Sequence, residues 1–165
     1  MAANNVIRLL EARKIKYQAF ELPVEKLGAL ETARLLNVPP EAVFKTIVVT
    51  RPRPGKPILA MIPATSEADL KAIAAACGEK KVTLPTQREA EAITGLPAGG
   101  ISALALINKG FQALIDQSAL RYSEIHISGG QLGLNIRLPV RDLVELTRAR
   151  PAAIAKPAPA PSDSD

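Results

Sequence analysis

A buried strand is predicted at Val43-Phe44-Lys45-Thr46-Ile47-Val48-Val49-Thr50, because β-branched and aromatic residues are typical of such strands. Lys45 interrupts this apolar run. An ammonium group in such surroundings either extends to water or meets a partner that keeps it charged. Two interpretations of Lys45 are therefore open: a surface lysine at the end of the strand, beside the polar Thr46, or a charged residue of a functional site.

Length and composition predict one domain. The chain has 165 residues, of which 47% are hydrophobic, and this is enough for a sizeable core. We expect the domain to occupy residues 1–150. From Pro151 the sequence consists mainly of Pro, Ala and Lys and ends in Ser-Asp-Ser-Asp, so we expect residues 151–165 to form a disordered tail.

Hydropathy and charge narrow the class of protein. No apolar run approaches the roughly 18 residues of a membrane span, and the first residues lack the pattern of a secretion signal, so we expect a cytoplasmic protein. The 21 basic and 16 acidic residues give a net charge of +5, which is compatible with a polyanionic partner such as nucleic acid. Aromatic residues make up only 3% of the chain, which favours contact with phosphates over stacking on bases.

Residues with nucleophilic or metal-binding chemistry are scarce. Cys77 is the only cysteine, and its place among alanines on a predicted helix is more typical of a small core residue than of a nucleophile. His126 is the only histidine, and its alternation with Ile125 and Ile127 is more typical of a structural or solvent-facing residue than of a base. We therefore expect no metal, no cofactor and no Ser-His-Asp triad.

Helices and strands alternate along the chain. The patterns predict helices near residues 5–14 and 30–36, after the capping sequences at Ser66 and Thr86, and from Pro139 to residue 146. Strands are predicted at residues 17–21, 58–62, 81–84, 104–107, 111–115, 124–127 and 134–138.

Short connections decide how these strands pair. Pro52-Arg53-Pro54-Gly55 is a turn, so residues 58–62 return antiparallel to the central strand in a hairpin with a basic tip. Several other pairs of strands are joined too briefly for parallel crossovers. We predict an α/β fold of the α+β type, with a curved, mixed and mostly antiparallel sheet that curls towards a barrel and is flanked by helices.

Two glycine-rich loops are candidates for a binding site. They are Gly99-Gly100-Ile101-Ser102 and Ser128-Gly129-Gly130-Gln131-Leu132-Gly133. One interpretation is tight turns that need positive φ angles. The other is a set of bare backbone N–H groups that face a carbonyl, carboxyl or phosphate group of a ligand. A nucleotide fingerprint is excluded, because the second loop leads into an alternating strand and not into a helix.

Three motifs in this order resemble the YbaK/prolyl-tRNA synthetase-associated editing-domain family: residues 43–48, 99–102 and 127–136. The resemblance covers residues 6–146. It implies a curved mixed sheet flanked by helices, and hydrolysis of mischarged aminoacyl-tRNA. In this family the free-standing YbaK branch removes cysteine from tRNA(Pro), and sister branches remove alanine or other small amino acids. The implied function is a free-standing deacylase for Cys-tRNA(Pro); the alternatives are a deacylase for alanine or serine and a non-catalytic module that binds tRNA or an aminoacyl group.

The resemblance also implies the residues of the site. Lys45 matches the functional lysine of the family, and it would either anchor the terminal adenosine phosphate or steady the charge that develops on the ester. Positions that match substrate-binding residues are Phe20, Thr46, Gly99, Gly100, Ile101, Ser102, Ser128, Gly129, Gly130 and Asn135. An aminoacyl ester is already activated, so backbone N–H groups and a lysine can suffice for its hydrolysis. The resemblance further implies that the thiol of a cysteinyl substrate attacks its own ester carbonyl.

Two positions depart from the family pattern. Ala103 stands where the YbaK branch has proline, and Asn135 stands where it has aspartate. The loss of that carboxylate removes a potential partner of Lys45. The partners implied are aminoacyl-tRNA, tRNA(Pro) in particular, and prolyl-tRNA synthetase, with no membrane. Basic residues that are candidates for contact with acceptor-stem phosphates, or are merely solvated, are Arg51, Arg53, Lys56, Lys80 and Lys81.

Overall fold

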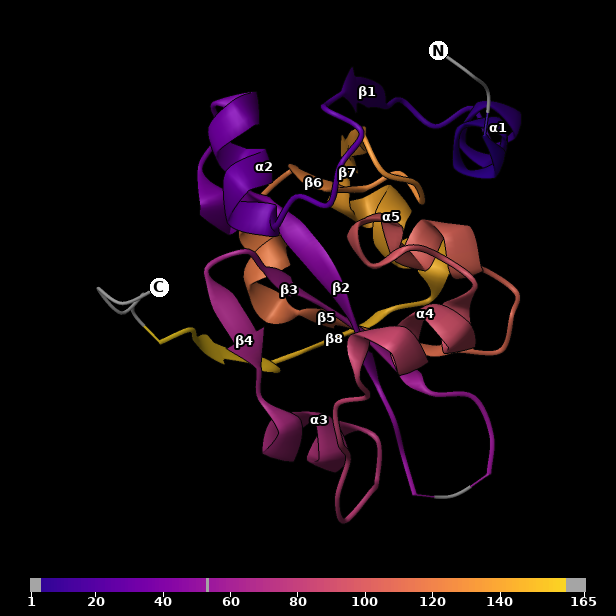
Figure 1. Cartoon of the computed structure of the whole chain (residues 1–165), viewed down its shortest axis with the longest axis vertical. Helices are drawn as coiled ribbons and strands as arrows, with labels where there is room; N and C mark the ends of the chain where they lie inside the picture. Colours follow the sequence, from indigo (N-terminus) through magenta and orange to yellow (C-terminus); the bar gives the residue numbers. More distant parts are fainter. Residues whose placement is uncertain (1–3, 53, 160–165) are drawn as a thin grey trace.

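The computed structural model describes residues 4–52 and 54–159, and its centre is a four-stranded sheet built on the stretch around Lys45. Strand β2 (Phe44–Val49) pairs antiparallel with β3 (Ile58–Pro63), so the predicted hairpin is confirmed, while Arg53 at its tip lies outside the described residues. Strand β3 also pairs parallel with β5 (Gln112–Asp116), which pairs parallel with β8 (Arg150–Ala152). The order is β2-β3-β5-β8 (Figure 1).

A second sheet lies beside the first. Its order is β1 (Gln18–Glu21), β7 (Leu134–Pro139) and β6 (Glu124–Ser128), and both pairs are antiparallel. A parallel bridge between Val43 and His126 joins β6 to the start of β2. A third, two-stranded sheet pairs β4 (Ser66–Ala68) with β9 (Ala155–Pro157). The mixed α+β fold is thus confirmed.

The expected curling towards a barrel is wrong for the described residues. The two larger sheets meet at one bridge and then separate, and each sheet keeps its own strand order. A barrel needs continuous pairing around its whole circumference.

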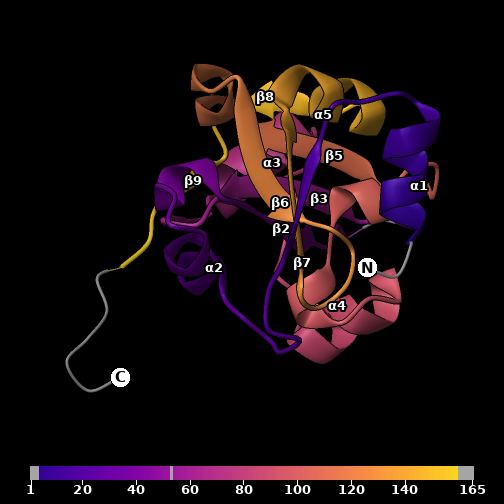
Figure 2. The same cartoon turned by 90° about the horizontal axis from the view of Figure 1, so that it is seen from above.

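Within residues 4–52 and 54–159, five α-helices surround the strands (Figure 2). They are α1 (Asn5–Ala12), α2 (Ala29–Leu36), α3 (Leu70–Ala76), α4 (Gln87–Thr94) and α5 (Val140–Thr147). Local signals account for their ends: Asn4 accepts a hydrogen bond from the Ile7 N–H, and Thr86 forms the predicted capping box with Glu89. Among the described residues, none of these helices is long and apolar enough to cross a membrane.

Three predicted elements differ from the structure. The capping sequence at Ser66 opens strand β4 and not a helix, because this segment pairs with β9; helix α3 begins later, where Asp69 accepts from the Ala72 N–H. The strand predicted at residues 104–107 is a 3-10 helix (Ala103–Leu106), begun by a hydrogen bond from the Leu104 N–H to the Ser102 hydroxyl. The strand predicted at residues 81–84 contributes only a bridge between Thr83 and Thr50.

The prediction of a disordered tail is wrong for residues 151–157. These residues include most of β8 and all of β9. Asp116, at the end of β5, accepts hydrogen bonds from the backbone N–H groups of Ile154 (3.0 Å) and Ala155 (3.1 Å), and the Ile154 side chain is fully buried. A single anchored apolar residue and two strand pairings therefore order a segment whose composition alone is typical of disorder. Residues 160–165 lie outside the described residues.

The hydrophobic core has two main parts, on opposite faces of the central sheet. Successive residues of a strand point to opposite faces, so Thr46 shares a face with Phe44 and Val48, whereas Lys45 lies on the face of Val49. Cys77 packs on that second face, where burial is the largest effect on its thiol and raises its pKa. This agrees with its interpretation as a small core residue.

Candidate active site in the gap between the sheets

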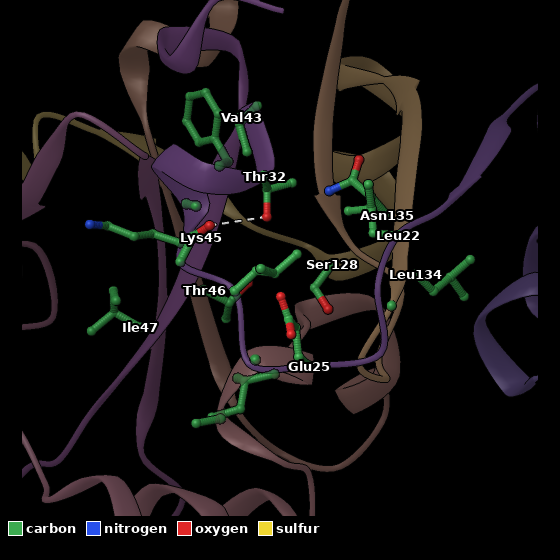
Figure 3. A pocket seen from close by; sticks show the side chains of 18 residues that line it. Leu22, Glu25, Thr32, Val43, Lys45, Thr46, Ile47, Ser128, Leu134 and Asn135 are labelled. Carbon is green, nitrogen blue, oxygen red and sulfur yellow. Dashed lines mark hydrogen bonds between the residues drawn. The ribbon is translucent and has the colours of Figure 1, made fainter. Parts of the chain in front are cut away.

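A cavity of about 240 Å³ lies where β2 and the β6–β7 hairpin separate (Figure 3). One wall is β2, and the facing wall is the end of β6 and the start of β7. Two loops complete the cavity, the segment of residues 22–28 and the loop at Gly99. The cavity is smaller than the roughly 300–1,000 Å³ of pockets for drug-sized ligands. Its size suits a small acyl group.

The free edge of β2 presents backbone groups to the cavity. The Ala64 N–H donates to the Val43 carbonyl, so alternate residues of β2 bond to β3 while Phe44, Thr46 and Val48 direct their backbone groups to the other edge. At one end of this edge Val43 is bridged to β6, and at the other end Thr50 exchanges both of its backbone bonds with Thr83. The N–H and carbonyl of Thr46 are left between these closed ends, beside the cavity.

Lys45 contributes to the lining of the cavity but does not direct its charge into it. The residue lines the cavity, but its ammonium group points away from the other lining side chains (Figure 3). Burial lowers the pKa of Lys45, and the nearby carboxylate of Glu67 on β4 opposes this shift. Glu67 also pairs with Lys156, at 3.5 Å. Lys45 is therefore neither a plain surface lysine nor a charge aimed at the centre of the cavity.

The facing wall carries two polar side chains held in place by hydrogen bonds. Ser128 and Asn135 are partners in the register of β6 and β7. The Ser128 hydroxyl oxygen accepts from the Gly130 N–H at 3.2 Å, which leaves its own proton free for a ligand. The Oδ1 atom of Asn135 lies 2.9 Å from Nδ1 of His126, and both residues are only 4% exposed.

His126 determines what Asn135 offers to the cavity. Burial is the main effect that lowers the pKa of His126, so its ring is neutral at neutral pH. When the neutral ring donates from Nδ1 to Oδ1, the amide nitrogen of Asn135 is the end that points into the cavity (Figure 3). The ring of Phe20 lies 5.4 Å from the His126 ring and covers it. Asn135 is therefore a donor with a fixed orientation and not a vacant partner for Lys45.

The glycine loops serve mainly to pack closely. A Cβ atom at Gly100 would lie 2.9 Å from the Cα of Gln131, and one at Gly129 would lie 2.5 Å from the Leu134 side chain. The glycine at position 100 lets the two loops approach each other, and the one at position 129 lets the β6–β7 hairpin pack on its own Leu134. Gly99 lines the cavity, so its backbone N–H group can face a ligand there. Gly100 and Gly129 do not line the cavity, so this interpretation does not apply to them.

The structure brings some of the predicted site residues together and places the others behind them. The cavity is lined by Lys45, Thr46, Gly99, Ile101, Ser128 and Asn135. Away from its lining are Phe20, Gly100, Ser102, Gly129 and Gly130. Ser102 is fully buried and starts the 3-10 helix described above. These residues support the wall and do not form it.

Sequence reasoning missed three polar residues of this region. Glu25 and Thr32 line the cavity, and His126 orients Asn135. The alternation of β6 did contain a signal for His126, because residues two apart on a strand share a face and Ser128 was already a candidate. No local pattern pointed to Glu25, which lies in a loop, or to Thr32, which lies within α2.

The geometry does not resemble a serine hydrolase or a metal centre. In the part of the chain that the structure describes, no hydrogen bond joins Ser128 to His126, whose Nδ1 is engaged by Asn135. The same residues contain no group of three or more histidine, cysteine, aspartate or glutamate side chains that could hold a metal ion. The site thus offers hydrogen-bond donors and charges, arranged around a small cavity.

The basic residues near the hairpin tip are not equivalent. Arg51 donates to the Gln112 side chain at 2.6 Å, lies 3.8 Å from Glu79, and its side chain is only 14% exposed. Its partners within the fold give it a structural role and leave little of its side chain for the predicted contact with acceptor-stem phosphates. Lys56 lies over the ring of Phe111. Lys80 and Lys81 are exposed and stay candidates.

Comparison with known proteins agrees with this geometry. The model of the aminoacyl-tRNA editing domain matches residues 25–146. A protein of Enterococcus faecalis (strain ATCC 700802 / V583), EbsC, named as a candidate Cys-tRNA(Pro)/Cys-tRNA(Cys) deacylase, is 34% identical over 152 residues, which cover 91% of this chain and 92% of EbsC.

Solved structures share the fold. A crystal structure of hypothetical protein APE2540 has a TM-score of 0.83 at 23% identity and covers 93% of this chain and 100% of its own. A candidate trans-editing enzyme for prolyl-tRNA synthetase has a TM-score of 0.78 at 23% identity and covers 94% and 99%. Because the family match extends over residues 25–146 and the identity to EbsC is 34%, this chain belongs to the aminoacyl-tRNA editing domain family.

Proposed function

We propose that this protein hydrolyses the ester bond of mischarged aminoacyl-tRNA, with Cys-tRNA(Pro) as its main substrate. The observation that carries the choice of substrate is the identity of 34% to EbsC, which extends over nearly the whole length of both chains. The small cavity supports a compact amino acid such as cysteine, alanine or serine. This function requires tRNA as a partner and places the protein in the cytoplasm, with prolyl-tRNA synthetase as a proposed second partner.

The acyl group occupies the cavity between β2 and the β6–β7 hairpin. An aminoacyl ester is activated, so the site has to orient it and to stabilise the oxyanion of the tetrahedral intermediate. Three donors surround the space where that oxygen forms: the Thr46 N–H on the free edge of β2, the Ser128 hydroxyl and the Asn135 amide. None of them has to act as a nucleophile.

Lys45 binds the phosphate of the terminal adenosine. Its ammonium group points away from Ser128 and Asn135, which supports an anchor at the edge of the cavity over a role at the oxyanion (Figure 3). A lysine stem is long and flexible, so the ammonium can follow a phosphate that arrives from outside. Lys45 in this role sets the depth to which the ester enters the cavity.

A panel of three charged tRNAs tests the proposal. Purified protein is incubated with Cys-tRNA(Pro), Ala-tRNA(Pro) and Ser-charged tRNA, and the loss of the ester is followed. We expect the fastest hydrolysis with Cys-tRNA(Pro). Comparable hydrolysis of Ala-tRNA(Pro), whose side chain holds no nucleophile, would move the assignment to a small-amino-acid deacylase that uses water. Salt-dependent tRNA binding without hydrolysis of any of the three would contradict the enzymatic role.

A further inference from the structure

The segment between β1 and α2 covers one side of the cavity and is held at both ends. The Leu22 N–H donates to the Gly133 carbonyl at 2.9 Å. At the other end, the Gly28 carbonyl accepts from both the backbone N–H (3.0 Å) and the hydroxyl (3.1 Å) of Thr32. Between these two anchors, Glu25 lines the cavity. Its position is thus a consequence of the fold and not of a free loop.

The loop at Gly99 lies next to this segment. A Cβ atom at Gly99 would lie 3.5 Å from the Cα of Lys26 and 3.8 Å from the backbone N of Leu27. The loop at Gly99 and the segment at Glu25 therefore lie backbone against backbone, and both contribute to the lining of the cavity.

Glu25 is the charged group that faces the inside of the cavity. The charged residues of the lining are Glu25 and Lys45. Figure 3 shows the Glu25 carboxylate pointing into the cavity, whereas the Lys45 ammonium points away from it. Among the salt bridges of the described residues, none involves Glu25. The carboxylate is thus free to take a cation from a ligand.

The substrate carries a cation at the matching place. An aminoacyl ester has an α-ammonium group one carbon away from the ester carbonyl, so the carbonyl can meet the donors of Ser128 and Asn135 while the ammonium meets a carboxylate. We propose that Glu25 binds the α-ammonium group of the aminoacyl ester, an inference that rests on the proposed function. The enzyme would then select esters with a free α-amino group and act poorly on those in which it is blocked, as in peptidyl-tRNA.

A substrate that lacks only the α-amino group tests this role. Glu25→Gln and the wild type are compared on Cys-tRNA(Pro) and on the same tRNA charged with 3-mercaptopropionate, which keeps the thiol and the ester. Removal of the amino group also lowers the intrinsic reactivity of the ester, so the readout is the ratio of kcat/KM between the two proteins on each substrate. Glu41→Gln, at another exposed glutamate near the start of β2, is the matched control, and the melting temperature of each variant is measured.

The expected result is a ratio that depends on the amino group. Glu25→Gln should lower kcat/KM on Cys-tRNA(Pro) by about 10-fold, the effect of a lost charge-assisted hydrogen bond, and leave the 3-mercaptopropionyl ester within about twofold. Glu41→Gln should change neither. Equal ratios on the two substrates would overturn the proposed role of Glu25 and leave the proposed function intact. No hydrolysis of Cys-tRNA(Pro) by the wild type would overturn both this role and the proposed function.

Discussion

The two walls of the cavity are built in opposite ways. The wall of β6 and β7 is rigid: Asn135 and His126 are both 4% exposed and bonded to each other, and Phe20 covers the histidine ring. The wall of β2 combines backbone groups at a free strand edge with the half-buried, flexible Lys45. A fixed donor suits a developing oxyanion, whose position is set by the chemistry. A flexible cation suits a phosphate, whose position varies with the tRNA.

The largest effect is expected on the flexible wall. Lys45→Ala should lower kcat/KM by about 100-fold or more, because a charged contact to phosphate is lost along with the positioning of the ester. The melting temperature should hardly change, since burial already disfavours the charge of Lys45. Steady-state kinetics and thermal unfolding measure the two effects.

Lys156→Ala is the matched control, because Lys156 pairs with Glu67 near Lys45 without lining the cavity. It should keep full activity. A large loss of stability in Lys45→Ala would return Lys45 to a structural role.

The close packing of the glycine loops gives the next prediction. Gly100→Ala places a Cβ atom 2.9 Å from the backbone of Gln131, so it should destabilise the fold by about 1–3 kcal/mol and lower activity by displacing the loop at Gly99. Gly28→Ala, with nothing within 4 Å of its Cβ position, is the control and should be nearly neutral. Urea unfolding distinguishes them. Equal stability of the two variants would show that the loops pack less tightly than described.

On the rigid wall, His126 should act only through Asn135. His126→Phe and Asn135→Ala should each lower kcat/KM by about 10-fold, because the donor is misoriented in one and absent in the other. The double variant should be no worse than Asn135→Ala alone. Effects that add in the double variant would show that His126 has a separate role. Higher activity of His126→Gln than of His126→Phe would support the hydrogen bond to Asn135.

Asn135→Asp restores the aspartate of the family pattern on this wall and tests whether the departure matters. It keeps an acceptor for His126 but replaces the donor that faces the cavity by a carboxylate oxygen. We expect a change in rate or in the preference among cysteine, alanine and serine, measured with the same tRNA panel. Identical kinetics would show that the departure at this position is incidental.

The smallest effect is a dependence of stability on pH. The pKa of His126 is lowered in the folded state, mainly by burial, with Arg137 also lowering it and Glu124 and Asn135 opposing. Below the ordinary pKa of about 6.5 the unfolded chain therefore binds a proton that the folded chain does not, and the free energy of unfolding falls as the pH falls.

This slope is limited to about 1.4 kcal/mol per pH unit. Urea unfolding at about pH 7.5 and about pH 5.5, on either side of the ordinary histidine pKa, measures it. His126→Phe should be less sensitive to pH over this range, because His126 is the only histidine. An equal dependence of the free energy of unfolding on pH in the wild type and His126→Phe would show that a group other than His126 causes it.

Several elements were predictable because their signals are local. The β2–β3 hairpin follows from an apolar run, a turn and a second apolar run, and α4 follows from a capping box at Thr86 and a stop at Gly95. The errors lie where distant segments compete with local preference. Ser66 has the form of a helix cap, yet pairing with β9 makes it the start of a strand.

The candidate site divides in the same way. Motif order along the chain identified Lys45, Thr46, Gly99, Ser128 and Asn135 as site residues, and all of them line one cavity. No spacing in the sequence indicates that His126 bonds Asn135, or that the segment of Glu25 lines the cavity. Both depend on contacts between segments that are far apart or loosely patterned.

Local elements, family motifs and the residue types of the site follow from the sequence. Three features follow from tertiary contacts: the Lys45 ammonium points away from the cavity, the Asn135 amide points into it, and residues 151–157 contribute to two strands. The physical reason is that orientation and order at these places depend on burial and on hydrogen bonds with partners that local preference does not specify.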